Sequence, residues 1–421
     1  MNRPTPPIAD LSGADRARRL PRRSFLQMAA GLAAGGALSG SLPALAARLV
    51  QMPFANGGRQ LIRFPQKREM ILLRERPPLL ETPFEVFDEG VFTPNDRFFV
   101  RWHLSAIPTA IDVNTFRLRI DGHVRTPREF TLQEILRQPD QVEMAAVNQC
   151  SGNSRGFSTP RVPGGEWGNG AMGNARWTGI TLKSLLDRVG VLSGAVQVRF
   201  RGLEFGETPE TPVFMKSLAI DHAMDREVMV AYGMNGTQLP LLNGFPLRLI
   251  VPGWYSTYWV KMLSHIEVLD HPDDNYWMRT AYLIPDTPGA TMVPGAKDVK
   301  MVPINRMVPR SFITNLRDNA TIRRGAPVKV RGIAFGGDTG VKQISFSADG
   351  GASWRNAVLD KDYGRYSFRR WHTSFVPSEA GAYKLLVNAT NSNNLAQPSS
   401  PTWNPGGYML NVIEQVTVHT A

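Results

Sequence analysis

The stretch Val147-Asn148-Gln149-Cys150-Ser151-Gly152-Asn153-Ser154-Arg155-Gly156 carries the only cysteine of the 421-residue chain. It follows the apolar run Met144 to Val147, which is typical of a strand end, so Cys150 is placed at a strand-to-loop junction. The small residues after it allow a ligand to approach the backbone, and Arg155 would favour a thiolate and attract an anion. The segment therefore predicts a ligand-binding loop.

Two other interpretations of Cys150 follow from its residue type. Most lone cysteines are small buried hydrophobes, but the polar Asn148, Asn153 and Arg155 beside Cys150 do not suit an apolar core. A cysteine nucleophile would need a general base, for which His103 is available, although the sequence does not place the two side chains together. The ligand-binding interpretation is preferred, and the hydrolase interpretation stays open.

The composition excludes several classes of protein. With 42% hydrophobic and 20% charged residues, the chain is typical of a globular protein of two or three domains. A single Cys excludes an intrachain disulfide, a Cys-rich zinc site, a Cys-ligated iron–sulfur cluster and the two-Cys attachment of c-type haem. No run of about 18 apolar residues follows the N-terminal segment, so no membrane span is expected in the mature chain. The net charge of +12 is spread without a Lys/Arg-rich run, which favours a small anion over nucleic acid as partner.

Residues 1–46 have the pattern of an export signal. The pair Arg22-Arg23 precedes Phe25-Leu26, a weakly apolar Gly/Ala-rich stretch follows, and Ala44-Leu45-Ala46 is a small-residue cleavage pattern. The glycines of this stretch would each destabilise an amphipathic first helix by about 1 kcal/mol, which disfavours that alternative. We expect a twin-arginine signal peptide, export in the folded state, and a mature periplasmic protein that begins near Ala47.

Hydrophobic periodicity predicts a mixed α+β domain over 47–300. Period-two alternation predicts a strand over 116–122, and further strands are expected over 196–200, 228–232 and 247–251. Helices are expected to begin at Thr131 and to cover 179–189. Residues 51–97 are rich in proline and are expected to be irregular.

The composition changes after Pro285, where a proline-rich stretch is typical of a linker. Beyond it, short runs of period two alternate with turn signals, of which Asp349-Gly350-Gly351 is the clearest hairpin turn. Several short strands over such a length indicate an immunoglobulin-like β-sandwich. We expect this second domain to cover 301–421 and to serve in packing or assembly.

Blocks of the first domain resemble the sulfite oxidase family of molybdenum enzymes. The loop from Cys150 to Arg155 is similar to that family's molybdenum-ligand loop. Three further blocks match in order and spacing, and they are Phe99 to His103, Gly165 to Gly179, and Ala231 to Lys261. The resemblance implies a sulfite-oxidase-type mixed α/β molybdopterin domain followed by an immunoglobulin-like β-sandwich dimerisation domain.

The resemblance also assigns roles to individual residues. Cys150 becomes the one protein ligand of molybdenum, which suits a soft thiolate. The substrate-pocket positions are Arg101, Arg155, Trp167 and Tyr282. The positions that hold the pterin and its phosphate are His103, Asn243, Arg248 and Lys261, with Trp259 and Ser217 as weaker candidates. Guanidinium groups suit the oxygens of a small oxyanion, and cationic and amide donors are what a buried phosphate requires.

Departures from the family pattern concern the pocket side chains. Asn243 stands where many members have His, and Ser154 stands where animal and plant members have a second Arg. In those members the second domain contributes an Arg, but this chain has Pro405-Gly406 there. One pocket cation is therefore missing or supplied elsewhere. Three candidates to supply it are Arg365, Arg369 and Arg370.

Other polar and aromatic residues have structural interpretations. Arg176 is expected to be an ion-pair partner, and Trp177, Tyr258 and Trp254 are as readily core aromatics as site walls. Five histidines without grouped spacing are expected at the surface or in packing rather than at a metal. They are His222, His265, His271, His372 and His419.

The resemblance implies a molybdenum–molybdopterin cofactor, no haem in this chain, and oxidation of sulfite to sulfate. Electrons would pass to an external c-type cytochrome, and the chain would form a homodimer. Alternatives are a sulfane dehydrogenase subunit of a thiosulfate-oxidising system, a sulfoxide reductase, and a non-catalytic periplasmic anion-binding protein. A binding protein would hold no molybdenum.

Overall fold

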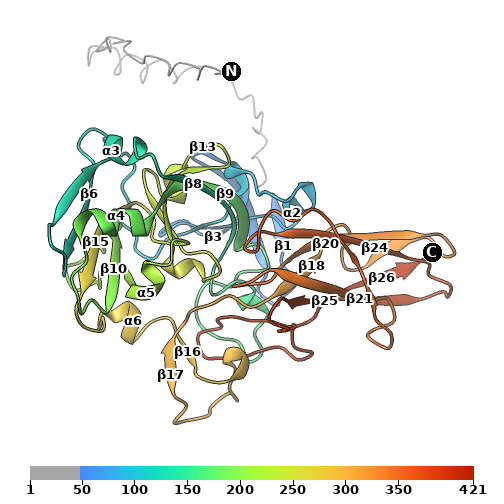
Figure 1. Ribbon diagram of the computed structural model, residues 1–421. Helices are drawn as coiled ribbons and strands as arrows, with labels where there is room; N and C mark the ends of the chain where they lie inside the picture. Colours follow the sequence, from blue (N-terminus) through green and yellow to red (C-terminus); the bar gives the residue numbers. More distant parts are fainter. Residues whose placement is uncertain (1–47) are drawn as a thin grey trace, which may run out of the picture. The chain divides into compact units, whose positions relative to one another are not determined.

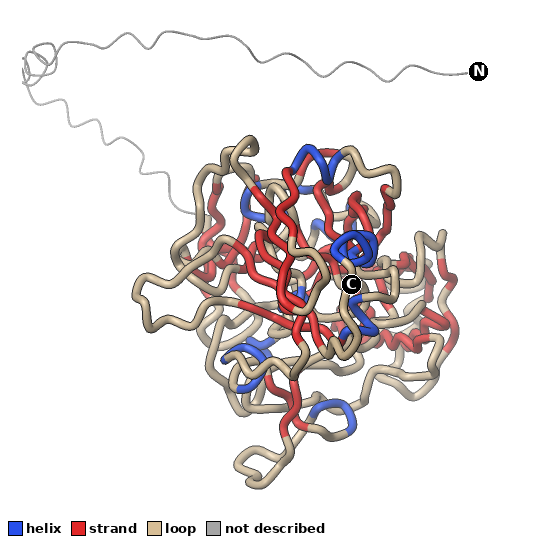
Figure 2. The backbone as a smooth tube through the Cα atoms, turned by 60° about the vertical axis from the view of Figure 1, so that its left-hand side comes forward, coloured by secondary structure: helices blue, strands red, loops and turns tan. Residues whose placement is uncertain are grey.

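The computed structural model of the protein describes residues 48–421 (Figure 1). The predicted signal peptide at 1–46 lies outside the described residues. Within residues 48–421, no helix is both long and apolar enough to cross a membrane. Strands dominate the architecture and the helices are short, as the blue segments of Figure 2 show. They are α2 (Val86–Glu89), α3 (Leu132–Leu136), α4 (Leu182–Val189), α5 (Ile220–Ala223) and α6 (Tyr276–Arg279).

The N-terminal part of the chain forms an antiparallel sheet, so the prediction of irregular structure over 51–97 was wrong. The sheet has the order β1 (Leu49–Gln51), β2 (Gly58–Phe64), β3 (Lys67–Arg74), β4 (Leu79–Glu81) and β5 (Val100–Arg101). Its prolines, such as Pro65 and Pro77, lie in the turns between strands, where they remove no ladder hydrogen bond. Met70, Leu80 and Val100 pack with Trp102 in a small core.

Two further sheets build the middle of the molecule. The first has the order β11 (Met215–Ala219), β10 (Gln197–Gly202), β15 (Leu263–Leu269), β6 (Arg117–Gly122) and β7 (Arg128–Thr131). The second has the order β13 (Thr237–Gln238), β12 (Met229–Met234), β9 (Met172–Thr181) and β8 (Gln141–Gln149), and β14 (Arg248–Ile250) also pairs with β12. The strands predicted over 116–122, 196–200, 228–232 and 247–251 are confirmed within one or two residues at their ends.

The helix predictions are confirmed with one change of boundary. Thr131 caps α3 through its hydroxyl and Glu134 completes the capping box, as the residue types favour. The helix predicted over 179–189 begins only at Leu182, because Gly179 and Ile180 pair with β12 as the end of β9. The side chain of Thr181 then accepts a hydrogen bond from the N–H of Ser184.

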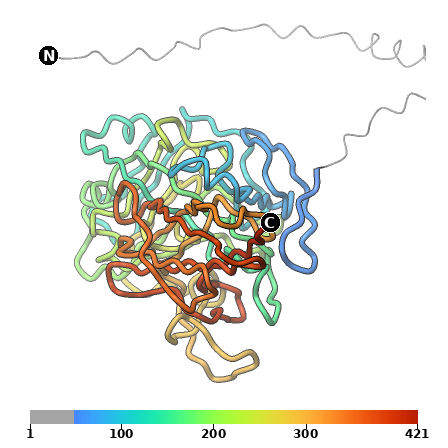
Figure 3. The backbone as a smooth tube through the Cα atoms, turned by 90° about the vertical axis from the view of Figure 1, so that its right-hand side faces the viewer, coloured from blue at the N-terminus to red at the C-terminus, as the bar shows by residue number. Residues whose placement is uncertain are grey.

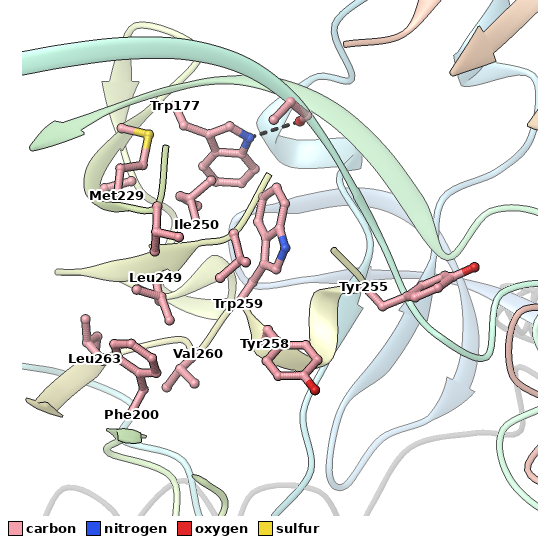
Figure 4. Packing of buried hydrophobic residues seen from close by; sticks show 14 of the residues in the cluster. Trp177, Phe200, Met229, Leu249, Ile250, Tyr255, Tyr258, Trp259, Val260 and Leu263 are labelled. Carbon is pink, nitrogen blue, oxygen red and sulfur yellow. Dashed lines mark hydrogen bonds between the residues drawn. The ribbon is translucent and has the colours of Figure 1, made fainter. Parts of the chain in front are cut away.

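The main hydrophobic core lies between these two sheets. Figure 4 shows Trp177 and Ile250 of one sheet beside Trp259, with Phe200 and Leu263 of the other sheet nearby. The dashed line marks the hydrogen bond that the indole N–H of Trp177 donates to the carbonyl of Ala146, at 3.1 Å. Large buried aromatic side chains therefore form the base on which the site described below is built.

The C-terminal part is the predicted β-sandwich. One sheet has the order β18 (Arg310–Ile313), β20 (Val328–Phe335), β24 (Arg369–Phe375) and β23 (Val358–Leu359). The other has the order β19 (Ala320–Ile322), β26 (Glu414–Thr420), β25 (Ala382–Asn391), β21 (Val341–Ser347) and β22 (Arg355–Asn356). The turn predicted at Asp349-Gly350-Gly351 joins β21 to β22, and both glycines have positive φ. The chain between β16 (Leu283–Pro285) and β17 (Met301–Pro303) projects from the body in Figures 1 and 3.

Candidate active site

Cys150 lines a cavity whose walls come from several separate segments of the chain. Seven of the residues assigned to the site from the sequence line it, namely Arg101, His103, Cys150, Asn243, Arg248, Lys261 and Tyr282. Arg101 ends β5 and Arg248 begins β14, and the other five lie outside the strands, far apart in the chain. The cavity is therefore assembled by the tertiary fold around the predicted cysteine loop.

The loop that carries Cys150 is held by backbone hydrogen bonds. The N–H of Cys150 donates to the carbonyl of Ala171, and the N–H of Asn153 donates to the carbonyl of Cys150, both at 2.9 Å. The side-chain oxygen of Asn153 accepts from the N–H of Ala171 at 2.9 Å. Asn153 thus ties the loop to the start of β9. This explains an asparagine three residues after the cysteine and fixes the thiol at the cavity wall.

Arg101, at the end of β5, places a buried guanidinium in the cavity. Its carbon Cζ lies 5.7 Å from the centre of the Tyr282 ring, and its Nη1 has no hydrogen-bond partner among residues 48–421. Burial opposes the charge, but Tyr282, Cys150 and Glu204 favour it and together raise the pKa of Arg101. Burial raises the pKa of the Tyr282 phenol, so this hydroxyl stays protonated and is a donor. Arg101 and Tyr282 therefore offer donors to an anion.

His103 is buried as a neutral ring. Burial lowers its pKa well below the usual range, and the charges of Arg101 and Lys261 lower it further. The ring stacks on Phe214 with centres 3.4 Å apart, and neither ring nitrogen has a hydrogen-bond partner among the described residues. A neutral imidazole has one donor and one acceptor nitrogen. His103 can therefore bind a group that presents both an acceptor and a donor.

Arg248 and Lys261 form a cationic corner of the cavity. The Arg248 guanidinium lies 5.2 Å from the ring centre of Trp177 and 5.9 Å from that of Trp259, and donates to the carbonyl of Asn243 at 3.1 Å. Its Nε has no partner in the described chain. The Lys261 ammonium lies 4.4 Å from the Trp102 ring centre. Burial lowers the pKa of Arg248 to about 9 and that of Lys261 to about 7.

The buried lysine predicts a pH dependence of stability. Burial lowers the pKa of Lys261 from 10.5 to about 7, so between these values the folded protein binds fewer protons than the unfolded chain. Stability of the cofactor-free protein therefore rises with pH across this window. Lys261→Met should raise its thermal midpoint at about pH 6.5, by on the order of 3 °C, and flatten the rise toward about pH 9.

The exposed Lys329 of β20 provides the control for this measurement. Lys329→Met should leave both the midpoint at about pH 6.5 and the slope unchanged, since its ammonium is in water in both states. Equal slopes in Lys261→Met and the unmodified protein would show that Lys261 does not titrate with folding.

Three predicted residues have other contacts. The Trp259 indole N–H donates to the carbonyl of Trp254, so Trp259 supports Arg248 through its ring and does not line the cavity. The hydroxyl of Ser217 donates to Asp273, on the side of β11 away from the cavity. Trp167 is buried in the core and is not among the cavity-lining residues.

The structure adds two buried lysines that sequence reasoning missed. Lys216 precedes Ser217 and donates to the carbonyl of Trp277 at 2.7 Å, with its ammonium 5.7 Å from the ring centre of Tyr282. The sequence signal that could have identified Lys216 is its position inside the apolar stretch Phe214 to Leu218. Lys67 of β3 donates to the side-chain oxygen of Asn243 at 2.5 Å. Its neighbours in the sequence are polar or charged, so no sequence signal distinguished it as a buried lysine.

Arg155 lies next to the cavity and donates hydrogen bonds to both domains. Its Nε donates to the carbonyl of Gly406 at 3.0 Å, and its Nη1 donates to the carbonyl of Gly165 at 3.3 Å. The guanidinium carbon lies 5.2 Å from the ring centre of Tyr408, which itself stacks on Tyr282 at 5.2 Å. The C-terminal segment therefore supplies a carbonyl and an aromatic ring at the place where a cation was expected.

The candidates proposed to replace that cation do not do so, and this corrects the prediction. Arg365 pairs with Glu227, Arg369 pairs with Asp362 at 3.1 Å, and Arg370 donates to a backbone carbonyl of α2. None of the three lines the cavity. The reason is that their guanidinium groups are engaged by these other partners.

The structural interpretations of other residues agree with the contacts. Arg176 lies 3.7 Å from Glu143 as an ion pair, and Trp177 and Tyr258 are buried in the core. The five histidines expected at the surface or in packing each contact an aspartate or asparagine side chain: His222, His265, His271, His372 and His419. Within residues 48–421, no three His, Cys, Asp or Glu side chains gather as a metal-binding group.

Glycines around Arg155 predict a sensitive position. A Cβ atom on Gly152 would lie 2.5 Å from the Arg155 guanidinium carbon, so Gly152→Ala must displace this group. Because misplacement of a binding group by about 1 Å can reduce turnover by about 100-fold, we expect a loss of that order in kcat/KM for the anionic substrate. Gly90→Ala is the control, since nothing lies within 4 Å of its Cβ position and its backbone is extended. Equal kinetics of the two variants would contradict the expectation.

Two family models match the chain and define its class. Residues 104–277 match the oxidoreductase molybdopterin binding domain, and residues 301–421 match the Mo-co oxidoreductase dimerisation domain. Human mitochondrial sulfite oxidase is 31% identical over 364 residues, which cover 82% of this chain and 65% of the relative. Chicken sulfite oxidase is 33% identical over 353 residues, which cover 80% of this chain and 74% of the relative. The chain belongs to the sulfite oxidase family.

A solved structure shares the complete fold. The sulfane dehydrogenase SoxCD from Paracoccus pantotrophus superimposes with a TM-score of 0.69 at 22% identity, over 90% of this chain and 92% of that one. This likeness confirms the fold class expected from the sequence, a molybdopterin-binding domain followed by a dimerisation domain. The chain spans about 65% of the length of the human relative.

The cavity residues fit a molybdenum–molybdopterin cofactor. Several buried polar atoms at the cavity have no partner among residues 48–421, namely Nη1 of Arg101, both ring nitrogens of His103, Nε of Arg248 and Oγ1 of Thr257. Buried polar groups without partners are destabilising, so such a set indicates a polar ligand. Cys150 would hold the metal, and Arg248, Lys261 and Thr257 would hold the anionic part of the pterin.

Proposed function

We propose that the protein is a molybdenum-dependent oxidoreductase that oxidises sulfite to sulfate. The observation that carries this proposal is the cavity that Cys150 lines together with buried cations and the phenol of Tyr282. When bound, the cofactor supplies the transfer of an oxygen atom to sulfur and the uptake of two electrons. Sulfite and water together become sulfate, two protons and two electrons.

The chain's own residues bind and orient the anion. The guanidinium of Arg101 offers a fork of N–H groups to the oxyanion, and the protonated Tyr282 offers a hydroxyl donor. Arg155 adds positive charge from behind Tyr408. Burial of these groups excludes water and strengthens their attraction for an anion relative to the same groups in solvent. Uptake of the anion therefore relieves the unpaired buried charge of Arg101.

The electron acceptor, the location and the assembly belong to the same proposal. We infer a periplasmic enzyme, exported by the twin-arginine route, that passes electrons to an external c-type cytochrome and carries no haem itself. The pattern of residues 22–46 supports the export route. The match of residues 301–421 to the dimerisation-domain model supports a homodimer.

A second candidate substrate is a sulfane sulfur. It is favoured by the segment Pro405-Gly406. There the carbonyl of Gly406 accepts a hydrogen bond from Arg155, at the place where a second cation was expected. With one fewer cation, the pocket is less adapted to a free dianion and accepts a group that carries less charge. The fold likeness to the sulfane dehydrogenase SoxCD is compatible with this alternative.

The deciding experiment combines metal analysis with turnover of the protein from a cofactor-competent host. About one molybdenum per chain, with sulfite-dependent reduction of ferricyanide and cytochrome c, is the expected result. Protein that holds molybdenum but does not oxidise sulfite would be assigned a sulfane or sulfoxide substrate instead. Protein without molybdenum that still binds sulfite would be an anion-binding protein.

A further inference from the structure

A second and larger cavity, of about 900 Å³, lies at the surface beside the N-terminal sheet. Its walls come from β2, from the end of β3, from β4 and from the loop over 161–166. The side chains of Leu73, Leu79 and Val162 form an apolar part of this wall. We call this cavity the hairpin pocket, after the β2–β3 hairpin that forms one side of it.

The hairpin pocket has an excess of positive charge. Arg59, Arg74 and Arg161 line it, and Glu166 is the only carboxylate among its lining residues. Glu166 is shared, since it lies 3.6 Å from Arg59 and accepts a hydrogen bond from Arg161. Arg74 has no ion pair and donates no side-chain hydrogen bond within residues 48–421. Two positive charges of the pocket are therefore not balanced by the protein.

The backbone of the pocket wall adds donors of the same kind. The N–H groups of Gly164, Gly165 and Glu166 donate to no described residue, while the carbonyl of Gly165 accepts from Arg155. Gly164 has a φ of +114°, a conformation that side chains rarely adopt. Successive free N–H groups in such a turn form a concave site that favours anions.

Only this glycine wall separates the hairpin pocket from Arg155. A Cβ atom on Gly164 would lie 2.8 Å from Nη1 of Arg155, so the guanidinium lies directly behind the wall. Arg155 in turn contacts Tyr408, which stacks on Tyr282 of the Cys150 cavity. The hairpin pocket, which Gly164 lines, is thus placed beside Arg155.

We propose that the hairpin pocket is a second anion-binding site, which takes a small, multiply charged sulfur oxyanion of the substrate's class. The proposal rests on the oxyanion chemistry proposed above. Guanidinium forks and free N–H groups recognise sulfonate-type oxygens without regard to the oxidation state of sulfur. A bound or passing anion raises the local substrate concentration beside Arg155, and this increases the rate of substrate capture without changing the chemical step.

Arg74→Glu tests the proposal, because Arg74 is exposed and has no structural partner. We expect about tenfold weaker binding of labelled sulfate in equilibrium dialysis of the holoenzyme, and about tenfold lower kcat/KM for sulfite at about 0.01 M ionic strength. The kinetic loss should shrink at about 0.3 M because salt screens the field, and kcat should stay constant. Arg324→Glu is the matched control, since it makes the same charge change at an exposed arginine of the β19–β20 turn.

The outcomes separate this proposal from the proposed function. Unchanged sulfate binding in Arg74→Glu would overturn the second site. Equal losses of sulfate binding in Arg74→Glu and Arg324→Glu would also overturn it, because they would be an effect of net charge. If the unmodified enzyme does not oxidise sulfite but Arg74→Glu alone loses sulfate binding, the second site is supported and the sulfite function fails. The selective loss in both measurements supports both proposals.

Discussion

Cys150→Ser is expected to lower turnover by on the order of 1000-fold and to lower the molybdenum content of the protein. The reason is the chemistry of the donor. A thiolate is a soft ligand suited to molybdenum, whereas a serine hydroxyl is harder and stays protonated at neutral pH. Because Cys150 is the one cysteine of the sequence, no other thiolate can replace it.

The loss can be assigned to Cys150 without ambiguity. Since the chain has one cysteine, thiol labelling reports on Cys150 alone. Cofactor-free protein should label to about one thiol per chain after opening of the buried site, and loaded protein should be protected. Backbone hydrogen bonds hold the loop, so Cys150→Ser should fold with a thermal midpoint close to that of the cofactor-free parent. Full metal content in folded Cys150→Ser would show that another group holds the metal.

Arg101→Gln is expected to lower kcat/KM for sulfite by about 100- to 1000-fold, which is the usual effect of removing one buried donor to a charged substrate. Glutamine keeps a hydrogen-bond donor and much of the length but removes the charge. The loss should appear mainly in KM if Arg101 binds the substrate, and in kcat if it acts only in the transition state. Arg101→Lys should recover part of the loss, because lysine restores the charge without the planar fork.

The control for Arg101 is Arg176→Gln. Arg176 is an exposed cation of β9 whose contacts are Glu143 and the Phe92 ring, and it lies outside the cavity. Its kinetics should match those of the parent enzyme. If Arg101→Gln also retained full kcat/KM and molybdenum, the substrate would bind elsewhere, and Arg155 would be the remaining cation to test.

The cysteine loop and its partners could be predicted from the sequence because they occupy strand ends in ordered blocks. Strand ends recur at the same edge of a fold, so Cys150, Arg248 and Lys261 meet in the cavity even though they are far apart in the chain. The same reasoning was weaker for Ser217. A strand alternates its side chains between two faces, and here Lys216, one residue away, has the contact with Tyr282.

The N-terminal sheet shows a second limit of local patterns. Its strands lie between proline-containing turns, and the small core of Met70, Leu80 and Trp102 exists only when distant strands pair. Pairing of β4 with β5 brings Arg101 to its place. A local window contains none of these long-range contacts, so 51–97 was predicted to be irregular.

The sequence by itself therefore determined the family, the cysteine at the site, and most of the polar side chains of the cavity, because residue type and spacing encode donor chemistry. Only the tertiary structure decided which of those side chains are free. Asn243 is engaged by Lys67, and Arg155 is held by the carbonyls of Gly165 and Gly406. The Lys261 ammonium lies over the Trp102 ring and donates no hydrogen bond within residues 48–421. The direction of a side chain and its choice of hydrogen-bond partner depend on its neighbours in space. Those neighbours are brought together by the tertiary fold and not by their order in the sequence.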